Sequence, residues 1–292
     1  MTATTATTAG ATAATRPPSS PRGLLLALLR LHRTALWFWL GLVTVAAGAL
    51  LWAIGPGADA AWAEYRGMGC DGGAPTLGCD LPGPAFFRYE TTVTVVLGLL
   101  MLLPTLTAAW AGGALVGREL ENGTAQLAWT QSVTPARWLA AKLAVPALPL
   151  VPGTLAITLL HRTLWTSDHH LMRVLAWRAW YDDGVFEANG VLATAHALTA
   201  LALGVLAGVL LRRALPALGV AVAAMACLTY VLDDLRPHLW PTPPGTAPLM
   251  HEHPASHFWP LQLVETGIVL AVAALATTTA FLVLRRRTGA AV

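Results

Sequence analysis

Apolar residues gather in blocks along this chain, separated by polar or Pro- and Gly-rich stretches. Each block is about 20 residues long, the length that a helix rising 1.5 Å per residue needs to cross ~30 Å of hydrocarbon. Shorter alternating or amphipathic patterns, typical of strands and surface helices in soluble domains, do not dominate. The pattern therefore predicts an all-α integral membrane protein with six transmembrane helices. We expect them at Ala35–Ile54, Val93–Val116, Trp138–Leu160, Gly190–Leu211, Leu215–Leu232 and Leu263–Leu284.

The segments between the blocks predict a single membrane domain. None of them exceeds roughly 40 residues, which is too short for an independent domain. Residues 1–22, rich in Thr, Ala, Pro and Ser, form a predicted disordered cytoplasmic tail, and residues 23–292 form the six-helix domain. Gly23–Arg33 is compatible with an interfacial helix that meets membrane lipid through Arg30 and Arg33, and equally with an extension of the first span.

Composition supports a membrane location, because 55% of residues are hydrophobic and only 11% are charged, against roughly 25% charged residues in soluble domains. The sequence pI is about 9.0. The basic residues are spread over several separate segments, so the charge predicts anchoring at a membrane face and no nucleic-acid partner.

The distribution of charge predicts that both termini are cytoplasmic in a multi-pass protein of the cell membrane. Lys and Arg near helix ends are retained on the inner side. An inward N-terminus places 12 of the 18 basic residues in inner segments, with Glu119 and Glu121 as the only inner acidic residues. The 12 are Arg16, Arg22, Arg30, Arg33, Arg118, Arg137, Lys142, Arg212, Arg213, Arg285, Arg286 and Arg287. The outer connections are then Asp59–Glu90, Arg162–Asn189 and Asp233–Gln262.

Two features of the predicted outer connections carry candidate chemistry. Cys70 and Cys79 lie nine positions apart in a Gly- and Pro-containing segment, which predicts a disulfide on the oxidising side of the membrane, with two free thiols as the alternative. Three histidines of the HEHPASH segment could ligate a metal, but nothing in the pattern fixes their geometry, so we predict no metal site.

The sequence lacks its own energy source and any recognisable catalytic motif. A phosphate-binding G-x-x-x-x-G-K-[ST] loop needs a lysine after glycine, and the only lysine, Lys142, follows Ala141. Neither G-x-S-x-G nor H-E-x-x-H is present. We therefore predict a non-enzymatic chain that binds no cofactor, with energy supplied by a partner or an ion gradient.

The inner connection between the second and third spans contains the most informative motif. Asn122-Gly123 can end a helical turn, Thr124 can cap a new helix, and Thr134-Pro135 combines a cap with a proline at the first helical position. These signals predict a short surface helix between two helix boundaries.

In this segment the sequence resembles ABC-2 type permeases, particularly those of actinobacteria. Their pattern is E-x-E-x-G-T, followed by W-T-Q-S-V-[ST], an Arg-Trp pair and a lysine. The corresponding residues are Glu119, Glu121, Gly123-Thr124, the WTQSVT segment 129–134, Arg137-Trp138 and Lys142.

The resemblance implies the membrane subunit of an exporter that is driven by ATP bound to a separate ABC ATPase. It implies that the short helix is the coupling helix, with the ATPase contact at Glu119, Glu121, Gly123, Thr124, Trp129, Gln131 and Arg137. Because six helices form half of the usual transporter, it also implies a homodimer or a heterodimer with a similar permease. Drugs, lipids, peptides and antibiotics are all compatible substrates.

The alternative is a stand-alone membrane transporter or sensor that no ATPase drives. Coupling to an ion gradient would be expected to place paired acidic groups deep within the helices. The candidates Glu90, Asp233, Asp234 and Glu265 lie near predicted span edges, which favours the ABC interpretation. A membrane enzyme would need a convergent catalytic set, which the sequence does not show.

Overall fold

The computed structural model describes residues 29–68, 83–130, 133–167, 171 and 178–289. Within them the structure is all helical, without strands, and six helices are long and apolar enough to cross a membrane. This confirms the predicted fold class. The tail 1–22 and the pair Cys70 and Cys79 lie outside the described residues, so the predicted disulfide stays a prediction.

The first two spans each combine an α-helix with a π-helical turn. The first consists of α2 (Arg33–Trp52), a π-helical turn (Ala53–Gly57) and α3 (Ala58–Gly67). The second consists of α4 (Pro84–Trp110), the π-helical segment η2 (Ala111–Gly117) and α5 (Arg118–Glu121). The short helix α6 (Thr124–Thr130) follows, and the third span is α7 (Pro135–Ser167).

The second half contains three further spans. After the short helix α9 (Asp183–Ala188) come α10 (Leu192–Leu211) and α11 (Ala214–Leu235), which continues into a 3-10 turn at Arg236–His238. Two 3-10 turns, Met250–Glu252 and Ala255–His257, lead into α12 (Phe258–Thr288).

Several predicted span boundaries were too narrow, and parts of the predicted outer connections are helical. The connection expected to begin at Asp59 is α3 as far as Gly67, and α4 begins at Pro84, nine residues before the predicted Val93. Apolar blocks mark only the part of a helix that lies in hydrocarbon, whereas main-chain hydrogen bonding continues into the interface. Pro84 at the first helical position is a sequence signal for the start of α4. In the structure, the Glu64 carboxylate accepts hydrogen bonds from the Ala85 and Phe86 main-chain amides at this start, each at 2.9 Å.

The three prolines of the third span do not end its helix. Pro146, Pro149 and Pro152 all lie inside α7, which runs continuously from Pro135 to Ser167. Trp39 of α2 donates its indole N–H to the Pro149 carbonyl at 2.8 Å. A proline removes one donor and crowds one carbonyl, and here packing of α2 against α7 holds the segment helical.

The bundle is built around α10, the most buried span, which packs against α4, η2, α7, α11 and α12. Close approach depends on two small-residue pairs. A Cβ at Gly204 would lie 2.6 Å from the Ala108 carbonyl oxygen, and one at Gly208 would lie 2.8 Å from Val116 Cβ. These glycines let α10 touch the backbone of the second span, as small-residue motifs do in membrane helices.

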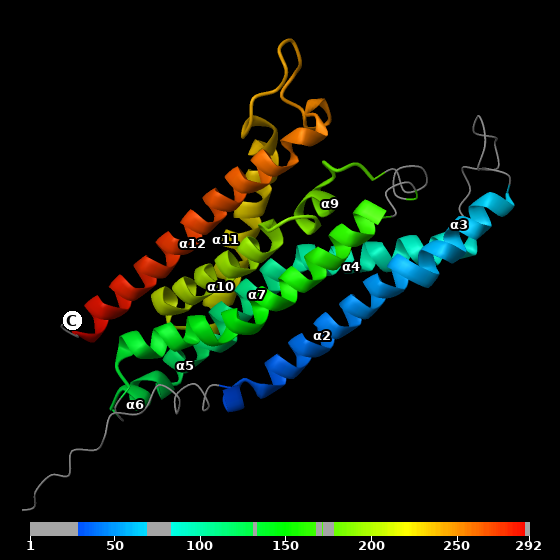
Figure 1. Cartoon of the computed structure of the whole chain (residues 1–292). Coiled ribbons are helices and arrows are strands. Elements are labelled where there is room, and N and C mark those ends of the chain that lie inside the picture. Colours follow the sequence, from blue (N-terminus) through cyan, green and yellow to red (C-terminus); the bar gives the residue numbers. More distant parts are fainter. Residues whose placement is uncertain (1–28, 69–82, 131–132, 168–170, 172–177, 290–292) are drawn as a thin grey trace, which may run out of the picture.

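The two ends of the bundle differ in what they carry. Figure 1 shows α5, α6 and the C-terminal end of α12 at one end, and α3 and α9 at the other. The peripheral helix α2 exposes large apolar side chains such as Trp37 and Phe38, at 70% and 74% of their surface. Apolar side chains facing outward are expected where lipid replaces water as solvent.

Candidate functional site

The helix boundaries around α6 follow the capping residues. Asn122 closes α5 by donating its amide to the Arg118 carbonyl at 3.0 Å, and Gly123 adopts φ +73°, a left-handed conformation that favours glycine. The Thr124 hydroxyl donates to the Glu119 carbonyl at 3.1 Å, so it caps the end of α5 and not, as expected, the start of α6. Thr134 caps α7 as predicted, accepting from the Arg137 amide at 3.3 Å.

Glu119 connects this segment to the third span through a buried ion pair. One carboxylate oxygen accepts from the Lys142 ammonium at 2.5 Å, and the other accepts from the Trp138 indole at 3.2 Å. Lys142 is 1% exposed and Glu119 is 19% exposed. The partner of Glu119 is thus the only lysine of the sequence, although Arg118 is its direct neighbour in the chain.

His32, just before α2, completes this cluster at the same end of the bundle. Its Nε2 lies 3.3 Å from the Lys142 ammonium, and its ring meets Trp110 edge-on at 5.8 Å. Burial lowers the pKa of His32 from 6.5, the Lys142 charge lowers it further, and Glu119 opposes both effects. The cluster therefore joins three spans: His32 lies at the start of the first, Glu119 at the end of the second, and Lys142 in the third.

Glu121 connects the same segment to the fifth span. Its carboxylate accepts from the Ala214 amide at 2.9 Å, which satisfies one of the open N–H groups at the start of α11. A negative group at a helix N-terminus is also favoured by the helix dipole. The preceding residues Arg212 and Arg213 form the turn between α10 and α11, and Arg212 has φ 54°, uncommon for a residue with a side chain.

Gln126 of α6 reaches the same turn. Its side-chain amide lies between two groups, each at 3.0 Å, and in the orientation that satisfies both it donates to the Gly123 carbonyl and accepts from the Arg212 guanidinium. Thus α6 contacts the α10–α11 turn through its own side chain in addition to Glu121. An open cavity beside this contact, about 810 Å³, is lined by both arginines of the turn and by Leu120.

The remaining predicted residues divide between buried and exposed positions. Trp129 packs edge-on against Trp138 at 5.7 Å, and its indole N–H is buried without a hydrogen-bond partner among the residues that the structure describes. Leu127 on α6 is 64% exposed, and Arg137 is exposed and does not join the Glu119 cluster. Gln131 lies outside the described residues.

The sequence matches the model of a protein family described as ABC-2 membrane transporter related, over residues 41–236 and so over more than half of the chain. This chain belongs to that family. No curated protein and no solved structure matches it. The match runs from within α2 to the end of α11, so this ABC-2 family member carries Glu119, Glu121 and α6 inside the family region.

Members of the ABC-2 family are typically non-catalytic membrane subunits, which agrees with the missing phosphate-binding loop. The structure also places charged residues that the sequence analysis did not use. Arg236, fully buried, contacts Asp183, Asp233 and Glu265 at 2.6–3.0 Å. Glu265 was expected near a span edge, but it is 0% exposed within α12 and its charge is matched by Arg236. A single charge within an apolar run was the signal for Lys142.

The histidine segment of the predicted outer connection shows a contact between two rings. The Nδ1 atoms of His253 and His257 lie 3.0 Å apart, and His253 Nε2 lies 3.1 Å from the Pro237 carbonyl oxygen. Over the described parts of the chain, no group of three His, Cys, Asp or Glu residues is arranged to hold a metal ion. Cys227 is a free, exposed cysteine.

Proposed function

We propose that this ABC-2 family member is the permease subunit of an exporter that moves substrate outward, using ATP hydrolysis by a separate nucleotide-binding subunit. The observation that carries the proposal is the position of α6. It lies at one end of the bundle, and side chains within or next to it contact three different spans. Such a helix can pass a displacement by the ATPase to the membrane domain.

Two contacts define the route by which α6 would move the spans. Glu119, at the root of α6, is held by Lys142 of α7, so a shift of this turn pulls on the third span. Glu121 and Gln126 hold the α10–α11 turn, so the same shift acts on the central span α10. A buried ion pair transmits force well, because separating its members leaves an uncompensated charge.

This route changes the role of the two carboxylates. Both were candidates for direct contact with basic residues of the ATPase, but their oxygens already accept hydrogen bonds from the permease. We infer that they position α6, and that the exposed Leu127 and Arg137 contact the ATPase. An exposed leucine and an exposed basic side chain suit a partner groove that is apolar with an acidic rim.

The orientation and assembly follow from the charge pattern and the family. Arg118, Arg137, Arg212, Arg213 and Arg285–Arg287 flank the end that carries α6, and this favours a cytoplasmic location for that end and for both termini. Family members generally work with an ATPase partner. Six spans would form half of the transporter, completed by a second copy or a similar, actinobacterial-type permease, while ATP binds to the partner alone.

Cross-linking tests the docking surface. In a background without native cysteines, Leu127→Cys should form a bismaleimide cross-link to a cysteine-bearing ATPase subunit that is co-expressed with the permease. Leu249→Cys is the matched control and should not cross-link, because Leu249 is 47% exposed but lies in the connection between α11 and α12, away from α6. A cysteine at the neighbouring position 125 would be less informative, because Ala125 is fully buried and a reagent could not reach it from either side of the membrane.

Activity of the assembled complex tests the coupling. Glu121→Ala should leave insertion and accumulation unchanged, while ATP hydrolysis by the complex loses its dependence on the permease. Gly123→Val should act alike by excluding the left-handed conformation. Glu90→Gln at the other end is the control. If both variants behave as the control, α6 does not transfer energy. If the purified chain associates with no subunit bearing a phosphate-binding loop, the stand-alone transporter or sensor is favoured.

A further inference from the structure

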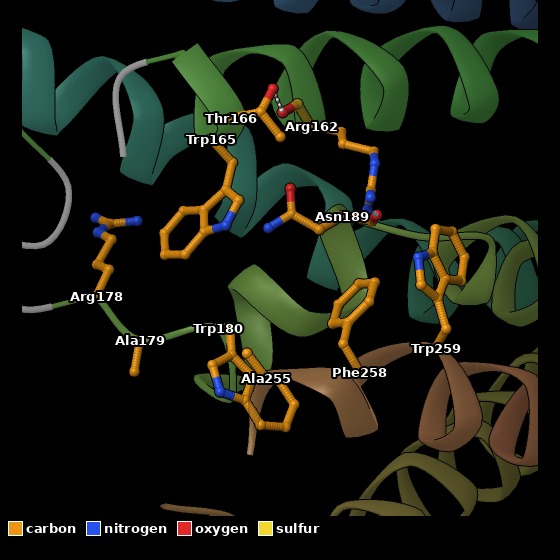
Figure 2. Close-up of a pocket in the computed structure, with 10 residues that line it drawn as sticks. All are labelled: Arg162, Trp165, Thr166, Arg178, Ala179, Trp180, Asn189, Ala255, Phe258 and Trp259. Atoms are coloured by element: carbon orange, nitrogen blue, oxygen red, sulfur yellow. Dashed lines mark hydrogen bonds between the residues drawn. The ribbon is translucent and has the colours of Figure 1, made fainter. Parts of the chain in front are cut away.

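A cavity of about 530 Å³ lies at the end of the bundle opposite α6. It is enclosed by the last turns of α7, the segment that precedes α9, and the first turn of α12. Cavities of roughly 300–1,000 Å³ hold organic molecules of drug size. Figure 2 shows that side chains from these elements converge on one space, with Trp165 and Asn189 lying between two arginines, Arg162 and Arg178.

The cavity is cationic, and no described residue neutralises its charge. No carboxylate is among the described residues that line it, and neither Arg162 nor Arg178 forms an ion pair within that part of the chain. Each guanidinium offers five N–H donors. Arg162 donates to the Asn189 carbonyl at 2.9 Å and Arg178 donates to the Thr94 hydroxyl, so most donors remain available.

A third arginine at the same end of the bundle shows the contrast. Arg236 is surrounded by three carboxylates at hydrogen-bond distance, as expected for a buried charge in a membrane protein. The chain therefore compensates one arginine of this end fully and leaves two others with open donors around a shared cavity. An anion supplied from outside the chain would complete the second arrangement.

The walls of the cavity are aromatic. Arg162 lies over the rings of Trp259 and Phe258, with its guanidinium carbon 4.8 Å and 5.7 Å from their centroids. This stacking fixes the plane of the guanidinium, so that its remaining donors have a defined direction. Trp165 and Trp180 complete the apolar surface. A ligand that fills this space would need both a flat or apolar body and an acidic group.

We propose that this cavity binds an amphipathic organic anion, whose carboxylate, phosphate or sulfonate meets Arg162 or Arg178 and whose apolar body lies against the tryptophans. The site is independent of the coupling contacts at the other end of the bundle. Two sources offer this chemistry, namely an anionic phospholipid and a small molecule that approaches from water. The same two arginines would bind the acidic group of either.

Two fluorescent probes that differ only by an acidic group test the site. The full chain in phosphatidylcholine nanodiscs is titrated with 1-anilinonaphthalene-8-sulfonate and, separately, with uncharged N-phenyl-1-naphthylamine. Binding is followed by energy transfer from tryptophan, with empty nanodiscs subtracted. We expect saturable binding of the sulfonate, weakened about tenfold by Arg162→Gln or Arg178→Gln, since a hydrogen bond to a charged group has this worth. Arg178→Gln keeps the Arg162 stack intact and guards against a folding defect.

The matched control is Arg88→Gln, at an exposed arginine near the start of α4 that donates a hydrogen bond to the Pro84 carbonyl. This variant should bind the sulfonate as the wild type does. Equal binding of the two probes, or sulfonate affinity that neither substitution at the cavity changes, would overturn the proposal.

Lipid arms of the same experiment identify the source of the ligand. If nanodiscs containing phosphatidylglycerol block the sulfonate, and native mass spectrometry shows retained phosphatidylglycerol that Arg162→Gln releases, the site binds an anionic lipid. If phosphatidylglycerol leaves sulfonate binding unchanged, the site takes a soluble anion.

Discussion

The ion pair between Glu119 and Lys142 makes a measurable prediction about stability. Glu119→Gln removes the one carboxylate of the described residues that contacts the Lys142 ammonium, which is 1% exposed. The second neighbour of that ammonium is His32, which cannot neutralise it. The variant therefore holds an uncompensated positive charge inside the bundle.

The expected magnitudes differ between the two partners. Breaking a buried pair by removing one member costs about 3–5 kcal/mol, so Glu119→Gln should lower the free energy of unfolding by about this amount. Lys142→Met should cost less, about 1–2 kcal/mol, because Glu119 keeps the Trp138 hydrogen bond and is 19% exposed. The double variant removes both charges and should recover at least about 2 kcal/mol relative to the sum of the single variants.

Titration with SDS in mixed micelles, followed by tryptophan fluorescence, measures these free energies of unfolding. Glu90→Gln, at the other end of the bundle, is the control and should change the free energy by no more than about 0.5 kcal/mol. If Glu119→Gln unfolds like this control, or if the double variant loses the sum of both single losses, the pair does not hold α5 to α7 and the reasoning is refuted.

Three further predictions concern other parts of the bundle. Arg236→Met should lower the free energy of unfolding by about 3–5 kcal/mol, because it leaves the buried carboxylate of Glu265 unpaired. Asp183→Asn, at a partner that is 58% exposed, should cost about 0–1 kcal/mol in the same titration. Gly204→Ala should lower the free energy of unfolding by about 1–3 kcal/mol, because the new Cβ would overlap a main-chain oxygen of α4. Gly219→Ala has open space around it and should stabilise α11 by up to about 1 kcal/mol. Equal effects of the two substitutions on the free energy of unfolding would contradict the close approach at Gly204. Burial lowers the pKa of His32 in the folded protein, so the unfolded chain binds a proton there at a higher pH, and stability should fall as pH drops below about 6.5. Thermal denaturation at pH 5 and pH 7.5 measures this loss, and the change in melting temperature between the two pH values should be smaller for His32→Gln than for the wild type. An equal change in both proteins would contradict His32 as the origin.

The sequence was sufficient for features that depend on local pattern. Blocks of apolar residues identified all six spans, because the length of each block reflects the thickness of the hydrocarbon. Asn122-Gly123 and Thr134-Pro135 located the ends of α5 and the start of α7, because capping depends on neighbouring residues.

Features that depend on tertiary pairing could not be predicted in this way. Glu119 has basic neighbours in sequence, yet its partner is 23 residues away on another helix. The three carboxylates around Arg236 come from α9, α11 and α12, which no local pattern brings together. Arg162 and Arg178 were expected in a single connection, whereas Arg162 lies inside α7 and one wall of the cavity comes from α12.

The burial of the only lysine has a practical consequence for chemistry performed on the protein. Amine-directed reagents such as succinimidyl esters need an accessible amine, and the ε-amino group of Lys142 is enclosed between Glu119, His32 and Trp138. All other basic side chains of the described surface are arginine or histidine, which such esters do not acylate stably. In a complex with a lysine-bearing partner, these reagents would mark the partner and leave the side chains of this subunit unmodified, so a map of its contacts has to rely on thiols or carboxylates.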